Sequence, residues 1–487
     1  MVALYLREPE YLMTLKDGTV KQLNPFSGTE VWTVAGRGNR PITVPHLDPA
    51  PIDVEQHGRY CAFCEHRYLD TPPEKARVVR DGDRWETRYR TPAEELAANV
   101  AEAMDGPSAT TTGADPGETA DGTGLAGTGT GAHGLNEATE AAEFRRIPNL
   151  FEILSYDYWH ANYGYELPEP VQEHADAYLA SPAGHAHVRR VVAAKLRAMG
   201  RTQADVDALD DAELKTFARS FFGGGHDVIV ARRHYTDGAT DTTQLASSGT
   251  LTPEEHYRFI AFTAESARDL FEVNRYARYV AVFQNWLGPA GASFDHLHKQ
   301  LAAIDERGVQ HELAHQRLRE NPNVYNDDAA NYAAYANLII AENEHALAFA
   351  GFGHRYPTIE IYSKSEACDP WDHRPEELRD VSDLIHAMHA ATGPHVPCNE
   401  EWHYRPIDFD VPMPWRVMLK WRISTLAGFE GATKIYLNTI DPYTVRDRVV
   451  SALFDLRDAG KIAHLRLATE CECRPNPLRY RANRVGQ

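Results

Sequence analysis

The chain has 487 residues, of which 43% are apolar, enough to bury two or three hydrophobic cores. Its formal net charge of -20, from 50 Lys and Arg against 70 Asp and Glu, argues against diffuse attraction to nucleic acid or to an anionic membrane. An anionic substrate would therefore have to be held by local cations.

Nothing in the sequence indicates a membrane or secreted protein. The first residues mix Arg7, Glu8 and Glu10 with short apolar stretches, which fits neither a signal peptide nor a transit peptide. No run approaches the roughly 18 apolar residues of a membrane span. Six cysteines in so long a chain do not resemble a disulfide framework, so we expect a cytoplasmic protein. Four of them receive no role: Cys368, Cys398, Cys471 and Cys473.

In chain order, the first half predicts two insertions and an alternating set of strands and helices. Gly106 to Gly134 is dominated by Gly, Thr, Ala and Asp, which predicts a disordered insertion, and residues 166–218 predict a helical one. The remaining apolar patterns predict strands at Asn149–Leu154 and Asp227–Ala231, a helix at Pro253–Asn274 with Thr252 as N-cap, and strands at Tyr279–Gln284 and His296–Leu301.

The second half repeats this order. The predicted elements are strands at His345–Phe349 and Thr358–Tyr362, a helix at Pro375–Ala390, and strands at Trp402–Phe409 and Trp415–Ile423. A strand, strand, helix, strand, strand order that occurs twice predicts an α+β fold made by duplication, with antiparallel sheets and flanking helices. We place the two units at residues 1–310 and 311–487.

The pair Cys61-x-x-Cys64 has a spacing that lets one tight turn present two thiolates to a tetrahedral metal ion. A redox-active pair is the alternative, but it would open a helix after a strand, whereas Pro72-Pro73 follows soon here. Metal binding is therefore the favoured reading. Two further ligands would be needed, and His234 and His296 are candidates among 23 histidines.

The run His296-x-His298-x-Gln300 places three polar side chains on one face of a strand, because strand side chains alternate. A metal ligand, a neutral imidazole nucleophile and an amide donor in line suit attack on phosphorus. The preceding Gly291-Ala-Ser293 could bring backbone N–H groups and a hydroxyl to phosphate oxygens. An ordinary strand that carries two histidines is the alternative.

Arg37 and Arg40 stand three residues apart in a Gly-rich segment of an otherwise acidic chain. Each guanidinium can chelate two phosphate oxygens, so they are candidate phosphate ligands, with solvated surface arginines as the alternative.

Taken together, these segments resemble the galactose-1-phosphate uridylyltransferase branch of the histidine-triad superfamily. The resemblance follows the chain in order through Asn24-Pro25, Arg37 and Arg40-Pro41, Cys61-x-x-Cys64, Thr71-Pro-Pro-Glu74, Arg146-Ile-Pro-Asn149, His226-Asp-Val-Ile-Val230, His234, Phe283-Gln-Asn285, Gly291-Ala-Ser293, His296-x-His298-x-Gln300, Glu342-Asn-Glu-His345 and Gly428-Phe-Glu430. It implies two histidine-triad-like units in one chain.

The resemblance also implies roles for particular residues. Zn²⁺ would be held by Cys61, Cys64, His234 and His296, and His298 would be the covalent nucleophile. Phosphate and substrate contacts would come from Arg37, Arg40, Ser293 and Gln300, and the nucleotide pocket would be lined by Asn149 and Asn285.

Two departures from the family pattern stand out. Leu297 lies between the histidines, where the family usually has Pro. A second metal site, which some members carry in the second half, is expected to be missing, because Pro414 and Arg416 occupy the positions of its histidines.

The resulting hypothesis is a nucleotidyltransferase that moves a nucleotidyl group between a nucleoside-diphosphate sugar and a sugar 1-phosphate through His298. A homodimer is compatible with this hypothesis. A phosphorylase or hydrolase with the same nucleophile is one alternative, because the pocket rather than the nucleophile selects the acceptor. A zinc-stabilised nucleotide-binding protein without turnover is another.

Overall fold

The computed structural model describes residues 10–37, 48–53, 58–90 and 142–481. The predicted insertion at 106–134 and the candidate Arg40 lie outside these residues. Within them, no helix has both the length and the apolar character needed to cross a membrane.

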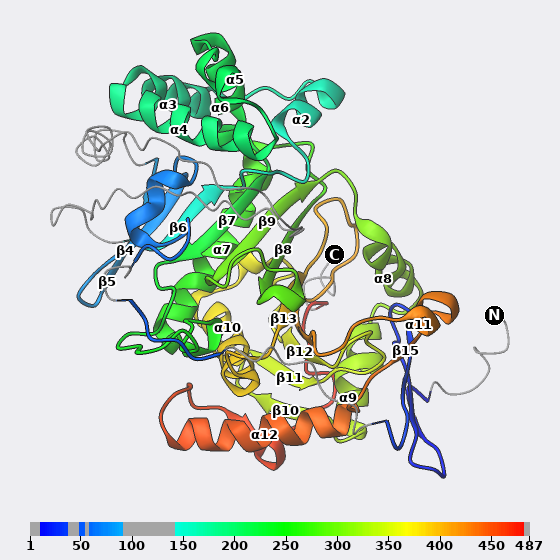
Figure 1. The fold of residues 1–487 in the computed structure, drawn as a ribbon. Helices are drawn as coiled ribbons and strands as arrows, with labels where there is room; N and C mark the ends of the chain where they lie inside the picture. The colour runs from blue at the N-terminus through cyan, green and yellow to red at the C-terminus, as the bar shows by residue number, and fades with distance from the viewer. Residues whose placement is uncertain (1–9, 38–47, 54–57, 91–141, 482–487) are drawn as a thin grey trace.

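A 12-stranded antiparallel sheet forms the centre of the molecule (Figure 1). Its strands, in spatial order, are β16 (Arg466–Leu467), β10 (Ile339–Glu342), β11 (Ala346–Ala350), β12 (Thr358–Ser363), β14 (Arg416–Trp421), β13 (Cys398–His403), β8 (Tyr279–Trp286), β9 (His298–Ile304), β7 (His226–Ala231), β6 (Ala142–Pro148), β4 (Ala76–Asp81) and β5 (Arg84–Tyr89).

The predicted duplication is visible in the order of the strands. The first half contributes β6, β7, helix α7 (Pro253–Val273), β8 and β9, and the second contributes β11, β12, helix α10 (Pro375–Thr392), β13 and β14. In the sheet, β6-β7-β9-β8 is followed by its mirror order β13-β14-β12-β11. The fold class predicted from the sequence is therefore confirmed, while the domain boundary near residue 310 stays a prediction.

Two of the predicted strands were wrong in their bounds. The first strand of the first half ends at Pro148, and residues 149–154 are turns, because the side chains of Asn149 and His226 accept hydrogen bonds from the N–H groups of Phe151 and Ile153. The strand predicted from Trp402 to Phe409 is Cys398–His403 instead and ends ahead of Pro406, which has no N–H to donate.

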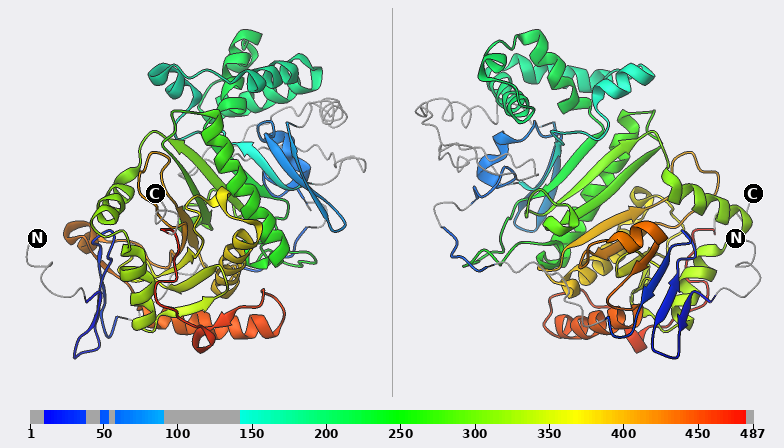
Figure 2. Two further views of the ribbon diagram at one scale, coloured as in Figure 1. Left: turned by 180° about the vertical axis from the view of Figure 1, so that it is seen from behind. Right: turned by 45° about the vertical axis from the view of Figure 1, so that its right-hand side comes forward.

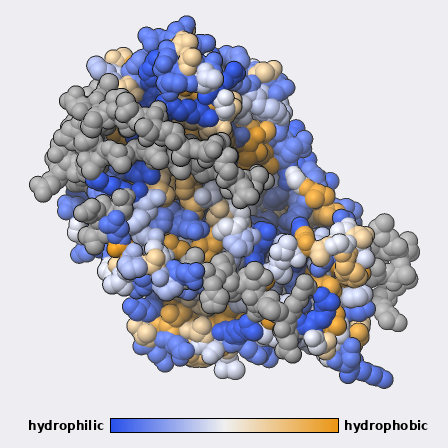
Figure 3. Space-filling model, viewed as in Figure 1, coloured by the Kyte–Doolittle hydropathy of each residue, from blue (hydrophilic) through white to orange (hydrophobic). Residues whose placement is uncertain are grey.

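The helical insertion predicted at 166–218 is confirmed. It consists of α3 (Glu169–Ala180), α4 (Pro182–Ala198), α5 (Gln203–Asp207) and α6 (Asp211–Gly223), preceded by α2 (Tyr156–Tyr163). These helices project from one end of the molecule, opposite α12 (Pro442–Asp458) (Figure 2). The apolar side chains of α3 to α6 form a separate core that includes Tyr68 and Leu150, and the outer face is mainly hydrophilic (Figure 3).

The N-terminal strands lie against the second half. β1 (Leu12–Thr14), β2 (Val20–Leu23) and β3 (Glu30–Thr33) form a small sheet with β15 (Ile435–Leu437), which follows helix α11 (Gly428–Thr433). Tyr325 lies in the chain between the helices α8 (Gly308–Glu320) and α9 (Tyr332–Tyr335). Phe26 stacks on it, with the ring centroids 4.5 Å apart.

The two halves are joined by β8 and β13, and a buried ion pair spans this junction. Lys299 Nζ of β9 lies 2.6 Å from Glu400 Oε2 of β13, and both side chains are inaccessible to solvent. His389 of α10 and the indole of Trp402 complete the hydrogen bonding of the Glu400 carboxylate. The surrounding cation and donors hold the pKa of Glu400 well below its usual range despite burial.

Replacing Glu400 should therefore destabilise the protein strongly. We expect Glu400→Ala to lower the free energy of unfolding by about 3–5 kcal/mol, because it leaves Lys299 charged, buried and unpaired. Denaturant titration of Glu400→Ala beside Glu272→Ala, which removes an exposed partner of Arg268, measures this. The control should change by less than about 1 kcal/mol, and equal effects of the two variants would contradict the assignment.

Candidate active site and metal centre

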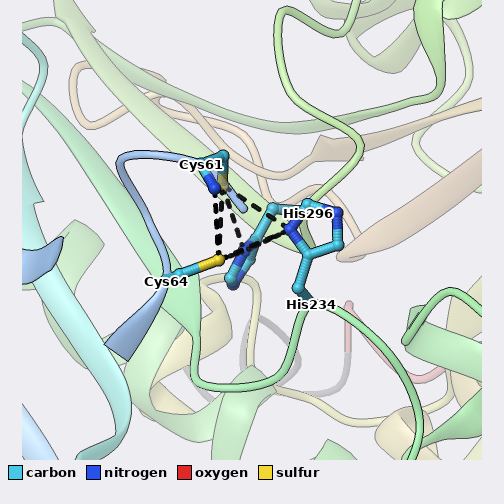
Figure 4. A group of neighbouring side chains, drawn as sticks. All are labelled: Cys61, Cys64, His234 and His296. Carbon is cyan, nitrogen blue, oxygen red and sulfur yellow. Dashed lines mark hydrogen bonds between the residues drawn. The ribbon is translucent and has the colours of Figure 1, made fainter. Parts of the chain in front are cut away.

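Four side chains from three separate segments converge on one point beside the first half of the sheet (Figure 4). Cys61 and Cys64 lie on a turn closed by the hydrogen bond from the N–H of Cys64 to the carbonyl of Cys61. His234 follows β7, and His296 precedes β9, so the strand predicted to begin at His296 begins at His298 instead. This set can hold one metal ion.

The distances between the four ligand atoms fit a tetrahedral ion. The two sulfurs are 3.8 Å apart, the two Nδ1 atoms 3.2 Å, and the sulfur–nitrogen distances run from 3.4 to 3.8 Å. Zinc bonds of about 2.3 Å to sulfur and about 2.0 Å to nitrogen require edges of roughly 3.3–3.8 Å. The cluster is therefore close to the shape that zinc would need.

The protonation states of the cluster also suit a metal. His296 Nε2 lies 2.6 Å from the carbonyl oxygen of Ala231, so this nitrogen carries the proton and the lone pair of Nδ1 is directed into the cluster, where a metal ion would lie. The hydrogen bond between the two thiols holds the pKa of Cys64 well below its usual range and raises the pKa of Cys61, so the pair shares one proton that a bound metal ion would displace.

His298 is the first residue of β9 and lies on the same strand face as Gln300. Its Nδ1 is 2.7 Å from the carbonyl oxygen of His296 and must donate to it, since a carbonyl can only accept. Burial lowers the pKa of His298 to about 4, so the ring is neutral near pH 7. A neutral ring with its proton on Nδ1 carries its free lone pair on Nε2.

His298 lines a cavity of about 300 Å³ between the sheet and the turn of Cys61. The other predicted residues in its lining are Asn149, Asn285, Ser293 and Gln300. The structure thus brings five of the predicted site residues together around one cavity. Arg37 is exposed after β3 and does not line this cavity.

The described lining includes Asp70 but neither Lys nor Arg. Asp70 is itself paired with Arg67 and with Arg190 of α4. Phosphate oxygens in this part of the cavity would meet neutral donors. The cations predicted for them, Arg37 and Arg40, stay predictions.

The helical insertion supports one wall of the cavity. His187 of α4 donates from Nε2 to the carbonyl of Thr71 at 2.9 Å, while its Nδ1 lies 2.7 Å from the hydroxyl of Tyr178. Thr71, Asp70 and Leu150 all line the cavity. Sequence patterns showed that the insertion is helical but gave no sign of this contact.

The second half carries a different side chain at the position of the nucleophile. His298 pairs with Val230 in the register of β7 and β9, and Arg416 pairs with Tyr362 in the corresponding register of β12 and β14. The Arg416 guanidinium donates to the Tyr362 hydroxyl and packs over the rings of Phe26 and Tyr325. Arg416 thus anchors the N-terminal sheet.

A larger cavity, of about 810 Å³, lies in the second half between α8 and the C-terminal segment. Its lining includes Arg319, Asn326 and Arg479 but neither histidine nor cysteine. We place the candidate active site in the smaller cavity, because it contains the neutral imidazole and the amide donor needed for attack on phosphorus.

Two fused α+β repeats that share one antiparallel sheet are a fold already seen in solved structures. An ADP-glucose phosphorylase from Arabidopsis thaliana with bound ADP-glucose matches with a TM-score of 0.51 and 15% identity, over 89% of this chain and 98% of that one. A GalT-like protein from Arabidopsis thaliana matches with a TM-score of 0.50 and 15% identity, over 88% and 98%. The resemblance to GalT-like proteins is thus confirmed at the level of the fold.

The chain belongs to the DUF4921 family, described as a domain of unknown function, whose model matches residues 15–106 and 124–480. No curated protein matches its sequence.

The metal centre can be tested directly. We expect the purified protein to contain about one zinc ion per chain and Cys64→Ala to lose it, because three remaining ligands hold a structural ion poorly. Elemental analysis of both proteins measures this, with Cys473→Ala, which removes an exposed cysteine outside the cluster, as the control. Equal metal content in Cys64→Ala and the unsubstituted protein would exclude the assigned ligands.

Proposed function

We propose that this protein is a nucleotidyltransferase that attacks a nucleoside-diphosphate sugar through His298 and forms a covalent nucleotidyl-histidine. The observation that carries the proposal is the fixed orientation of the His298 imidazole. Its Nδ1–H is fixed by the carbonyl of His296, so its Nε2 lone pair is available in a cavity that also holds the amide of Gln300.

In the first step, Nε2 of His298 would bond to the α-phosphorus as the bond to the bridging oxygen breaks. The sugar phosphate leaves with that oxygen and its electron pair. The imidazole becomes positively charged when it is nucleotidylated, and the Nδ1–H bond to the carbonyl of His296 stabilises that charge. Gln300 and Ser293 would donate hydrogen bonds to the non-bridging oxygens.

In the second step, an oxygen of the acceptor attacks the same phosphorus, and the bond to Nε2 breaks. The imidazole returns to its neutral form, so the cycle needs no net proton transfer to His298. The metal cluster takes no part in these steps. A zinc ion there would supply rigidity, because its ligand His296 is two residues from His298 and holds the start of β9 in place.

Two versions of this function differ in the molecule that accepts the nucleotidyl group from His298. A sugar 1-phosphate as acceptor gives a uridylyltransferase-like reaction, and inorganic phosphate gives a phosphorylase. The second version gains support from the ADP-glucose phosphorylase, whose fold matches over nearly all of both chains.

Intact-mass spectrometry tests both the nucleophile and the acceptor. We expect incubation with one member of a panel of nucleoside-diphosphate sugars to add one nucleoside monophosphate less water. His298→Ala should abolish this adduct, because it removes the attacking nitrogen. His185→Ala should keep it, because His185 is a half-buried histidine of the helical insertion that does not line the cavity. The sugar 1-phosphate released in the first step reverses the labelling in either version, so loss of the label on addition of inorganic phosphate, or of a different sugar 1-phosphate, identifies the acceptor.

Two results would overturn the proposal. A label that survives in His298→Ala would place the nucleophile elsewhere. A metal-loaded protein that no sugar nucleotide labels would favour the binding protein without turnover.

A further inference from the structure

His226 is a buried histidine that none of the roles above uses. It is the first residue of β7 and lines the same cavity as His298 and Gln300. The segment after β6 wraps around it. The N–H of Asn149 donates to the carbonyl of His226 at 2.8 Å, and the N–H of Ile153 donates to its Nδ1 at 3.2 Å. On its other side, Nε2 lies 3.1 Å from Oε1 of Gln300.

These contacts determine where the ring proton of His226 lies. A backbone N–H can only donate, so Nδ1 must be the acceptor for Ile153. Burial lowers the pKa of His226, and a neutral imidazole carries one proton, which is therefore on Nε2. Nε2–H must then donate to the atom of Gln300 that faces it.

The same reasoning orients the amide of Asn149. Its Oδ1 accepts from the N–H of Phe151 at 2.9 Å, so its Nδ2 is turned inward and lies 3.2 Å from Nε2 of His226 and 3.4 Å from Oε1 of Gln300. Because Nε2 of His226 carries the ring proton and cannot accept, Oε1 of Gln300 is the acceptor for Nδ2. Two donors, from His226 and Asn149, thus converge on one atom of the Gln300 amide. That atom must be the oxygen, an assignment that distances to a side-chain amide alone do not give.

The orientation of Gln300 decides what the amide offers to a phosphate. With its oxygen held by His226 and Asn149, its NH₂ group is left to face the other way, on the strand face that it shares with His298. A flipped amide would present an oxygen to phosphate oxygens, which repels them. It would also set NH₂ against two donors and lose both hydrogen bonds.

We propose that His226, with Asn149, is a positioning residue that locks Gln300 with its N–H donors toward the phosphoryl group attacked by His298. This inference rests on the proposed function. It also changes the role expected for Asn149, whose side chain is engaged with Gln300 and Phe151 rather than free to bind a nucleobase.

Two substitutions of His226 distinguish the positioning of Gln300 from a purely structural role, in which His226 would only hold the loop after β6. In His226→Asn, the shorter amide can accept from Ile153 but cannot reach Gln300, whereas in His226→Gln the longer amide can donate to Gln300 but loses the acceptor for Ile153. Both are made in the full-length, metal-loaded protein, and metal content and unfolding midpoint check the fold.

We expect His226→Asn to slow the labelling of His298 by about 10-fold to 100-fold, less than the 10²–10³ that loss of a whole transition-state donor costs. His226→Gln should retain most of the rate. In a Gln300→Ala background, His226→Asn should have no further effect, because it acts through Gln300. The proposal would be overturned if His226→Asn labelled His298 at the normal rate while His226→Gln labelled it slowly. It would also be overturned if the effects of His226→Asn and Gln300→Ala on the labelling rate were additive.

One further measurement does not depend on turnover. In spectra of protein labelled with ¹⁵N-histidine, the signals lost in His226→Asn should report a neutral ring protonated at Nε2. A His226 ring protonated at Nδ1 would refute the proposed positioning of Gln300 even if the enzyme were active. Conversely, a ring protonated at Nε2 in a protein that no sugar nucleotide labels would leave the geometry standing and count against the proposed function alone.

Discussion

The structure depends on the alternation of side chains along β9. His298 and Gln300 face the cavity, and Lys299 between them faces the opposite side, where it forms the buried ion pair with Glu400. The ion pair sits directly behind the nucleophile and is made between the two halves of the chain. A shift of β9 by one residue would bury the histidine in the core and expose the lysine to the cavity, so a large desolvation energy opposes that shift.

Local patterns were enough to indicate candidates for part of the site. The spacing of Cys61 and Cys64 is typical of a tight turn, and the two-residue period of His298 and Gln300 is that of a strand. His296 lies just before that strand, and its role and that of His234 came from the family resemblance. The predicted ligands do converge. The duplication could also be read from the sequence, because each half repeats the same apolar periods in the same order.

Long-range contacts were outside the reach of such patterns. Glu400 is 101 positions from Lys299 and stands in a strand whose bounds were wrong, so no spacing rule connects the two. His226 was noted only as part of a family segment, since its role comes from the N–H of Ile153 and from Gln300, which are distant in the chain. The segment after β6 was mistaken for a strand because Leu150, Phe151 and Ile153 are apolar, whereas the N–H groups of Phe151 and Ile153 donate to side chains and not to a neighbouring strand.

Asn399 of β13 shows how the second half contributes although it carries Arg416 in place of a nucleophile. Its Nδ2 donates to Asn285 Oδ1 and to the carbonyl of Ala290, each at 2.8 Å, so it holds both the cavity wall and the turn before Ser293. A truncated protein that ends after β9 would keep every proposed metal ligand and the nucleophile, yet it would lose Asn399 and expose Lys299. The smallest fragment able to form this site therefore extends through β13, and the repeats cannot be separated into a working half and a dispensable one.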